Sequence, residues 1–237
     1  MTETPPWLPD EAALAGGEHL DAAAVAGYDA KAAFDPGEDV ALLRSLGLGA
    51  GSTLIDLGAG TGTLALAAAP HLDRVVAVDV SPAMLAVLRR RARERGLANV
   101  EAVEAGFLAY EHAGPPADAV YSRNALHHLP DFWKALALTR VAAMLRPGGL
   151  LRLRDLAYSF PPDRAGEAIE AWLAGAPADP RVGYTRSELE RHVRCEQSSF
   201  TWLLEPMLER AGFEIRRAER SPSGVFAAYV CVRAGGG

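Results

Sequence analysis

The sequence has 237 residues, 49% of them hydrophobic and 23% charged, which predicts a globular protein with a sizeable core and excludes a disordered chain. The formal net charge of −6 argues against broad attraction to nucleic acid. Cys195 and Cys231 are too few for a disulfide scaffold or a cysteine zinc site, and no metal site is predicted.

The first residues contain no positively charged segment followed by an apolar one, so no signal peptide is expected. No apolar run approaches the length that spans a membrane. The sequence therefore predicts a soluble, cytoplasmic protein with no membrane partner and no nucleic-acid partner, and it leaves the oligomeric state open.

Residues 1–39 are predicted to form an N-terminal arm that contains a helix. Proline, alanine and glycine dominate residues 1–20, and Asp21 is a suitable N-cap for a helix that carries Tyr28. Tyr28 and Phe34 are large rings among alanines. They either dock this segment on the core or cover a ligand, and the sequence does not decide between these roles.

A helix is predicted at 40–48, and it is followed by a strand, a glycine turn and a second helix. Residues 53–57 form an apolar run that fits one buried strand. Glycines at 58, 60 and 62 allow a tight turn and a close approach of the backbone to a ligand. A helix starts at Leu64 and closes at Pro70, which completes a unit typical of nucleotide binding in open α/β sheets.

The second predicted strand, 74–79, ends in a carboxylate. Asp79 lies 21 residues after Gly58, where an acidic residue meets ribose hydroxyls in nucleotide-binding sheets. An aspartate in a loop is more often a helix or turn cap. Its place at the end of the second strand favours the ligand role.

The remaining elements alternate in the same way. Ser81-Pro82 is a hydroxyl cap followed by proline at the first helical position, so a helix is predicted from there to Gly96. Strands are predicted at 99–103, 118–122 and 150–154. Between the last two, Asp131 is the predicted cap of a long helix that ends at Leu145-Arg-Pro-Gly-Gly149.

Residues 157–200 are predicted to be a substrate cover, because loops beyond a central strand commonly build the ligand site of such sheets. Four prolines divide this segment into short helical pieces near 168–173 and 187–194. A helix at 201–211 and strands at 213–217 and 225–232, one of them antiparallel, complete the prediction.

Several motifs together resemble the class I S-adenosylmethionine-dependent methyltransferases of the small-molecule type. They are Leu54-Ile-Asp-Leu-Gly58 with Gly60 and Gly62, the stretch Ala125-Leu-His-His-Leu129 after strand four, and the Leu145-Arg-Pro-Gly-Gly149 turn. The resemblance covers roughly residues 40–156. It implies an α/β Rossmann-like fold: a seven-stranded, mostly parallel sheet with helices on both faces.

The resemblance also implies a single methyltransferase-like domain over 1–237. Its parts are the arm and lid at 1–39, the cofactor-binding core at 40–156, the cover at 157–200, and the last helix and strands at 201–237. The implied cofactor is S-adenosyl-L-methionine. The implied cofactor-binding residues are Tyr28, Asp56, Gly58, Ala59, Gly60, Asp79, Val80, Met84, Gly106, Phe107 and Asn124.

One departure from the family pattern concerns the adenine. Many relatives carry Gly-Asp-Ala after strand three, and the aspartate contacts the adenine amine. The matching residues here are Ala105-Gly106-Phe107, so the carboxylate is absent. Adenine is therefore expected to contact backbone groups near Gly106 and the Phe107 ring.

The implied reaction is in-line displacement at the sulfonium methyl carbon by a nucleophile of a small-molecule acceptor. The leaving thioether needs no proton, so alignment and exclusion of water are the enzyme's main contribution. A general base is needed only if the acceptor keeps its proton. His127 and His128 are the candidate catalytic residues, with Asp155 and Glu196 less direct candidates. The alternative is that the histidine pair shapes the loop and takes no part in catalysis.

The acceptor itself is not predicted. Aromatic residues in or beside the cover could form its pocket or simply pack the core: Tyr158, Trp172, Tyr184, Phe200 and Trp202. A rival function is an enzyme of this fold that uses the sulfonium cofactor for non-methyl chemistry, with Arg123 or Arg154 binding a second carboxylate. A nicotinamide-dependent oxidoreductase is disfavoured, because Thr63 replaces the third glycine of its fingerprint.

Overall fold

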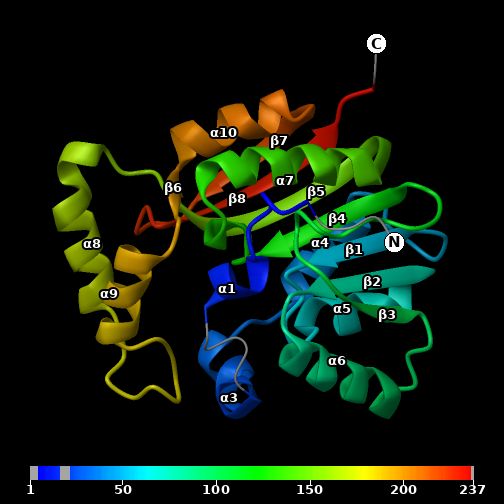
Figure 1. Cartoon of the computed structure of the whole chain (residues 1–237), viewed down its shortest axis with the longest axis horizontal. Coiled ribbons are helices and arrows are strands. Elements are labelled where there is room, and N and C mark those ends of the chain that lie inside the picture. Colours follow the sequence, from blue (N-terminus) through cyan, green and yellow to red (C-terminus); the bar gives the residue numbers. More distant parts are fainter. Residues whose placement is uncertain (1–4, 17–21, 236–237) are drawn as a thin grey trace.

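The computed structural model describes residues 5–16 and 22–235. Seven strands of this part form one sheet in the order β3-β2-β1-β4-β5-β8-β7, and the two-residue strand β6 pairs with β5 outside that path (Figure 1). The strands are β1 (Thr53–Leu57), β2 (Arg74–Asp79), β3 (Val100–Glu104), β4 (Ala117–Arg123), β5 (Leu145–Tyr158), β6 (Ser199–Phe200), β7 (Phe213–Arg220) and β8 (Phe226–Arg233). This arrangement confirms the predicted fold class.

The first five strands of the sheet run parallel. β1 pairs with β2 and β4, β2 pairs with β3, and β4 pairs with β5, all in parallel register. Strands β1 and β2 are buried over most of their length, as expected of strands covered on both faces. β8 is antiparallel to both β5 and β7, so it is the one antiparallel strand of the main path, in agreement with the sequence prediction.

Two layers of helices cover the sheet. Helices α4 (Gly37–Ser45), α5 (Thr63–Ala68) and α6 (Pro82–Glu94) pack with Leu54, Val75 and Ala119 on one face. Helices α7 (Asp131–Met144) and α10 (Thr201–Arg210) pack with Ile55 and Val76 on the other. Adjacent side chains of a strand point to opposite faces, so Leu54 and Ile55 pack into two separate hydrophobic cores.

Four further helices lie beyond the carboxyl ends of the strands. They are α1 (Glu11–Ala15), α3 (Ala22–Ala32), α8 (Ala165–Ala174) and α9 (Arg186–Cys195) (Figure 1). A salt bridge between Lys31 of α3 and Glu188 of α9 joins the N-terminal segment to the 157–200 segment. Three short 3₁₀ turns complete the described part of the chain, at Ala69–His71, Leu126–His128 and Pro162–Arg164.

Several boundaries differ from those predicted. The predicted cap Asp21 lies outside the described residues. α4 begins at Gly37 rather than 40, because Pro36 fixes the preceding backbone and Glu38 and Asp39 suit a first helical turn. α5 ends at Ala68, and Pro70 lies in the 3₁₀ turn that follows.

Asp131 is the first residue of α7 and not its cap. Its carboxylate instead accepts a hydrogen bond from Lys134 Nζ at 2.9 Å and another from Ser199 Oγ. Strand β5 is much longer than the predicted 150–154, because Leu145 already pairs with Ala117 and Tyr158 still pairs with Phe200. Within the described part of the chain, no helix is long and apolar enough to span a membrane.

Candidate functional site

The glycine turn after β1 needs glycine for two reasons. Gly58, Gly60 and Gly62 have φ values of +74°, +55° and +83°, which disfavour other residues. A Cβ at Gly58 would lie 2.3 Å from Ala125 Cβ, and one at Gly62 would lie 2.6 Å from Leu88 Cγ. At Gly60 the nearest atom is Tyr28 Cε1 at 3.9 Å, so this glycine faces open space under the N-terminal segment.

Asp79 connects this turn to the next helix. Its Oδ2 accepts a hydrogen bond from the backbone N–H of Gly60 at 2.8 Å, and its Oδ1 accepts one from Ser81 N–H at 2.8 Å. Ser81 is the N-cap of α6 and accepts a hydrogen bond from Met84 N–H at 3.1 Å, as the Ser-Pro pair predicted.

Asp56 is a second carboxyl group at this edge, and it is buried. Burial, together with the negative charges of Asp79 and Asp39, raises its pKa to about 7, although a hydrogen bond from Ala65 N–H opposes this rise. A sheet edge with two carboxyl groups, one of them reluctant to ionise, favours a ligand that brings positive charge.

Two adjoining cavities occupy the carboxyl edge of the sheet, with volumes of about 80 Å³ and 540 Å³. They share six lining residues: Tyr28, Gly58, Gly60, Arg123, Asn124 and His128. The smaller cavity is also lined by Asp79, Val80, Met84, Gly106 and Phe107, and the larger by Asp56, Ala59 and His127. All thirteen predicted site residues therefore line one or both cavities.

Glu11 also lines the smaller cavity, and the sequence contained no signal for it. Its Oε1 accepts hydrogen bonds from Leu108 N–H at 3.0 Å and Ala109 N–H at 3.1 Å. A Cβ at Gly106 would lie 2.3 Å from this carboxylate. Helix α1 thus brings a carboxylate to the turn after β3, where the family's aspartate is missing.

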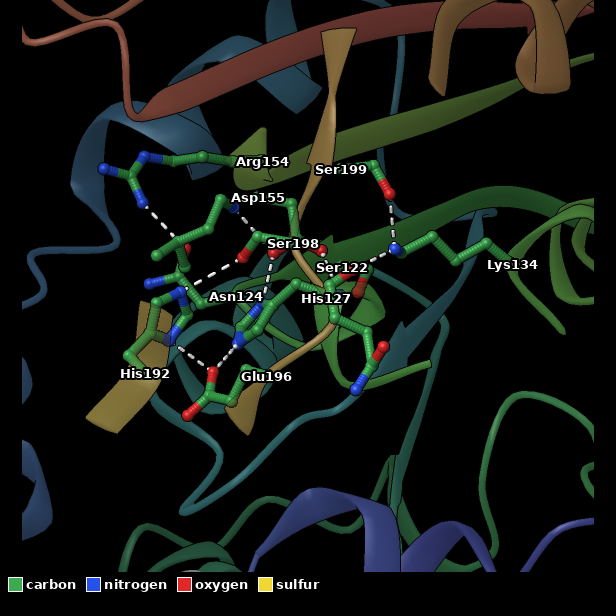
Figure 2. A network of polar contacts seen from close by, with 12 residues as sticks. Ser122, Asn124, His127, Lys134, Arg154, Asp155, His192, Glu196, Ser198 and Ser199 are labelled. Atoms are coloured by element: carbon green, nitrogen blue, oxygen red, sulfur yellow. Dashed lines mark hydrogen bonds and ion pairs between the residues drawn. The ribbon is translucent and has the colours of Figure 1, made fainter. Parts of the chain in front are cut away.

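A network of buried polar groups forms the wall of the larger cavity (Figure 2). Asp155 of β5 contacts His127, with Oδ1 2.5 Å from Nδ1 and Oδ2 accepting the His127 backbone N–H at 3.0 Å. The opposite nitrogen, His127 Nε2, lies 2.9 Å from Glu196 Oε2. His192 of α9 contacts the same Glu196 oxygen through Nδ1.

The imidazoles and carboxylates of this network stabilise one another's ionised forms. Burial lowers the pKa of His127, but Asp155 and Glu196 raise it more strongly, to about 9. Burial raises the pKa of Asp155 and Glu196, and the neighbouring imidazoles outweigh it, so both carboxyls have lowered pKa values. Without a further ligand, His127 is therefore a poor proton acceptor at neutral pH.

His128 occupies a different position from its neighbour. Its ring centroid is 4.2 Å from that of His127, yet it lines both cavities, whereas His127 lines only the larger one. Of the two predicted catalytic histidines, His128 is the one placed between the cavities. His192, which the sequence did not single out, completes the group from a helix 65 residues further on.

The predicted aromatic residues divide into two groups. Trp172 and Tyr184 line the larger cavity. Tyr158 and Phe200 pack against Phe160, and Trp202 stacks on Phe200 with 56% of its surface exposed. Arg123 lines both cavities, whereas Arg154 lines neither: its Nη1 donates to Asn124 Oδ1 at 2.9 Å, and its guanidinium lies 4.5 Å from the Phe226 ring centroid.

Comparisons with known proteins agree with this geometry. The model of the methyltransferase domain family matches residues 54–149. An uncharacterised methyltransferase of Mycobacterium tuberculosis, Rv0089, is 35% identical over 155 residues, which cover 60% of this chain and 75% of that protein. The uncharacterised methyltransferase YcgJ of Bacillus subtilis is 30% identical over 129 residues, covering 54% of this chain and 50% of YcgJ. The sequence match thus spans about half the length of YcgJ.

Solved structures share the fold. The crystal structure of YcgJ superimposes with a TM-score of 0.62 at 17% identity, covering 84% of this chain and 99% of that one. The [4+2]-cyclase SpnF has a TM-score of 0.62 at 18% identity, with 83% and 81% covered. With the glycine turn, the strand-two carboxylate and the matched sequence in agreement, the chain belongs to the class I S-adenosylmethionine-dependent methyltransferase family.

Proposed function

We propose that this protein binds S-adenosyl-L-methionine in the smaller cavity and transfers its methyl group to a small molecule held in the larger one. The observation that carries the proposal is that Gly58, Gly60 and His128 line both adjoining cavities, while Asp79 lines the smaller one. When bound, the cofactor supplies an electrophilic methyl group on a sulfonium.

The residues of the smaller cavity fit this cofactor. Asp79 would accept the ribose hydroxyls, and Gly60, which has no side chain and faces open space, permits close approach of the ligand. Glu11 and the backbone near Gly106 would hold the adenine. Asp79, together with Asp56 in the adjoining larger cavity, provides the negative potential that a sulfonium and an ammonium group require.

The larger cavity is the proposed acceptor site. Trp172 and Tyr184 offer apolar surface, and the imidazoles of His127 and His128 offer polar contacts. The Lys31–Glu188 salt bridge holds the N-terminal lid against the cover, so both segments enclose the ligands and exclude water. We propose the lid at 1–39 and the cover at 157–200 as parts of a single domain.

The first experiment is calorimetric titration of purified, ligand-free protein with S-adenosylmethionine and, in parallel, with NAD. We expect binding of S-adenosylmethionine alone, followed by transfer of a labelled methyl group in an acceptor screen. Binding of NAD alone would overturn the proposal. Mass spectrometry of the products tests the rival function, because non-methyl chemistry would add no labelled methyl group to the acceptor.

A specific observation bears on that rival. SpnF shows that this fold also hosts cyclisation. The rival with a second carboxylate requires an arginine at the ligand, and Arg123 lines both cavities. However, the Arg123 guanidinium lies 4.0 Å from the Phe34 ring centroid and 3.9 Å from Asp39, and Arg154 lines neither of these two cavities. The positions of the arginines therefore give little support to the rival function, and the cavity lined by histidines supports methyl transfer more strongly.

A further inference from the structure

Three ligating side chains converge on one point in the wall of the larger cavity. His127 offers Nε2, His192 offers Nδ1 and Glu196 offers a carboxylate oxygen, all within 4.8 Å of one another. The three come from two segments, because His127 follows β4 whereas His192 and Glu196 lie one helical turn apart at the end of α9. Figure 2 shows both rings directed at the Glu196 carboxylate.

We infer that His127, His192 and Glu196 form a binding site for a divalent transition-metal ion such as Zn²⁺. Two imidazoles and a carboxylate are a ligand set that such ions accept. Three protein ligands leave a coordination position for water or for a ligand in the cavity.

On each imidazole, the nitrogen that faces away from Glu196 already has a polar contact, as is usual for histidines that bind metals. Asp155 contacts His127 Nδ1 at 2.5 Å, which holds a proton on that nitrogen, so a metal that displaced the second proton would bind at Nε2. Ser198 Oγ lies 3.1 Å from His192 Nε2, which leaves His192 Nδ1 for the same ion. These contacts with Asp155 and Ser198 therefore fix the orientation of the two imidazole rings.

The carboxylate oxygen between the rings is buried and is shared by both imidazoles. Glu196 Oε2 lies 2.9 Å from His127 Nε2 and also contacts His192 Nδ1, although neither ring is aligned for a good hydrogen bond to it. All three side chains are thus directed at one point, which a cation could occupy. Asp155 and Glu196 also bring two negative charges, which a divalent cation between neutral imidazoles would balance.

The position of the site indicates a role, which rests on the proposed methyl transfer. The three ligands line the proposed acceptor cavity beside His128. An acceptor hydroxyl coordinated to the ion would lose its proton to water, and its oxygen would then attack the methyl carbon as the carbon–sulfur bond breaks. The acceptor class that fits this site is therefore a hydroxyl compound.

The test is a Zn²⁺ titration of untagged protein by calorimetry, with the metal content of the dialysed protein measured independently. We expect one ion per chain, and a loss of affinity of about 100-fold or more in His192→Ala and in Glu196→Gln, since changes even to supporting residues cost 10–100-fold. Glu190→Gln is the matched control, because Glu190 lies on the same helix and pairs with Arg186 at the surface. Circular dichroism checks that each variant folds.

Equal Zn²⁺ binding in wild type and both ligand variants would overturn the inference, as would no stoichiometric binding. In the second case, a proton shared between His127 and the carboxylates accounts for the network. Titration with S-adenosylmethionine separates this failure from failure of the proposed function. If the protein binds S-adenosylmethionine but not Zn²⁺, only the metal site is refuted. If it binds Zn²⁺ but not S-adenosylmethionine, only the proposed methyl transfer is refuted.

Discussion

Asp79 and Gly60 are joined by a hydrogen bond of 2.8 Å, from the glycine N–H to the aspartate carboxylate, across 19 residues of sequence. The contact ties the end of β2 to the turn after β1. It also places the carboxylate on the wall of the smaller cavity, where a carboxylate can accept hydrogen bonds from ligand hydroxyls.

Replacing Asp79 with alanine should weaken S-adenosylmethionine binding by about 1–3 kcal/mol, because charge-assisted hydrogen bonds to the ribose are lost. Calorimetric titration measures the change. Asp73→Ala is the control, since this aspartate is exposed at the opposite end of β2. Unchanged affinity in Asp79→Ala would remove Asp79 from the cofactor site.

Gly60→Ala should abolish or greatly reduce cofactor binding while the protein still folds. The added methyl group would enter the space under Tyr28, with no atom closer than 3.9 Å to force the fold apart. Gly96→Ala matches the backbone strain, because Gly96 has φ +65° against +55° at Gly60 and nothing within 4 Å of its Cβ. Thermal unfolding reports the strain in both variants, and only Gly60→Ala should also lose cofactor affinity.

Glu11→Ala should weaken cofactor binding by about 1 kcal/mol, roughly fivefold, because the N–H groups of Leu108 and Ala109 lose their acceptor and α1 loses its attachment. Faster hydrogen exchange in residues 107–109 and in α1 should accompany the change. Glu94→Ala serves as control, since Glu94 forms an exposed pair with Arg90. If the affinity stays at the wild-type value, α1 has no part in cofactor binding.

Asp56 should make the protein less stable as the pH rises. Its pKa of about 7 in the folded state exceeds the ordinary value of 3.8, so between these pH values the folded state keeps a proton that the unfolded state has released. The free energy of unfolding must then fall as the pH rises from about 4 to about 7.

Asp56→Asn removes this pH dependence and keeps a side-chain oxygen for the Ala65 N–H. Urea unfolding of both proteins at pH 4 and pH 8 measures the difference, and the comparison cancels the titration of other groups. Relative to wild type, the variant should gain stability between the two pH values, because a pKa difference of one between the folded and unfolded states corresponds to about 1.4 kcal/mol. A parallel pH dependence of the two proteins would show that Asp56 titrates normally.

The sequence by itself determined the core of the sheet. Strands β1, β2 and β4 were located within one or two residues, since buried apolar runs and the glycine turn are local patterns that the fold does not override. The same reasoning located Asp79 at the cavity edge, because the carboxyl ends of parallel strands meet there. Boundaries at α4 and β5 were less accurate, since tertiary pairing extended β5 and the first turn of α4 lacks an apolar pattern.

Only the tertiary structure decided which distant groups meet. Glu11 reaches Leu108 across 97 residues, and no property of the N-terminal arm foretold that contact. His127 and Glu196 were separate candidates in the sequence, and His192 was none; α9 brings all three together. Local patterns report burial and backbone shape, whereas contacts between loops depend on how each loop folds back over the sheet.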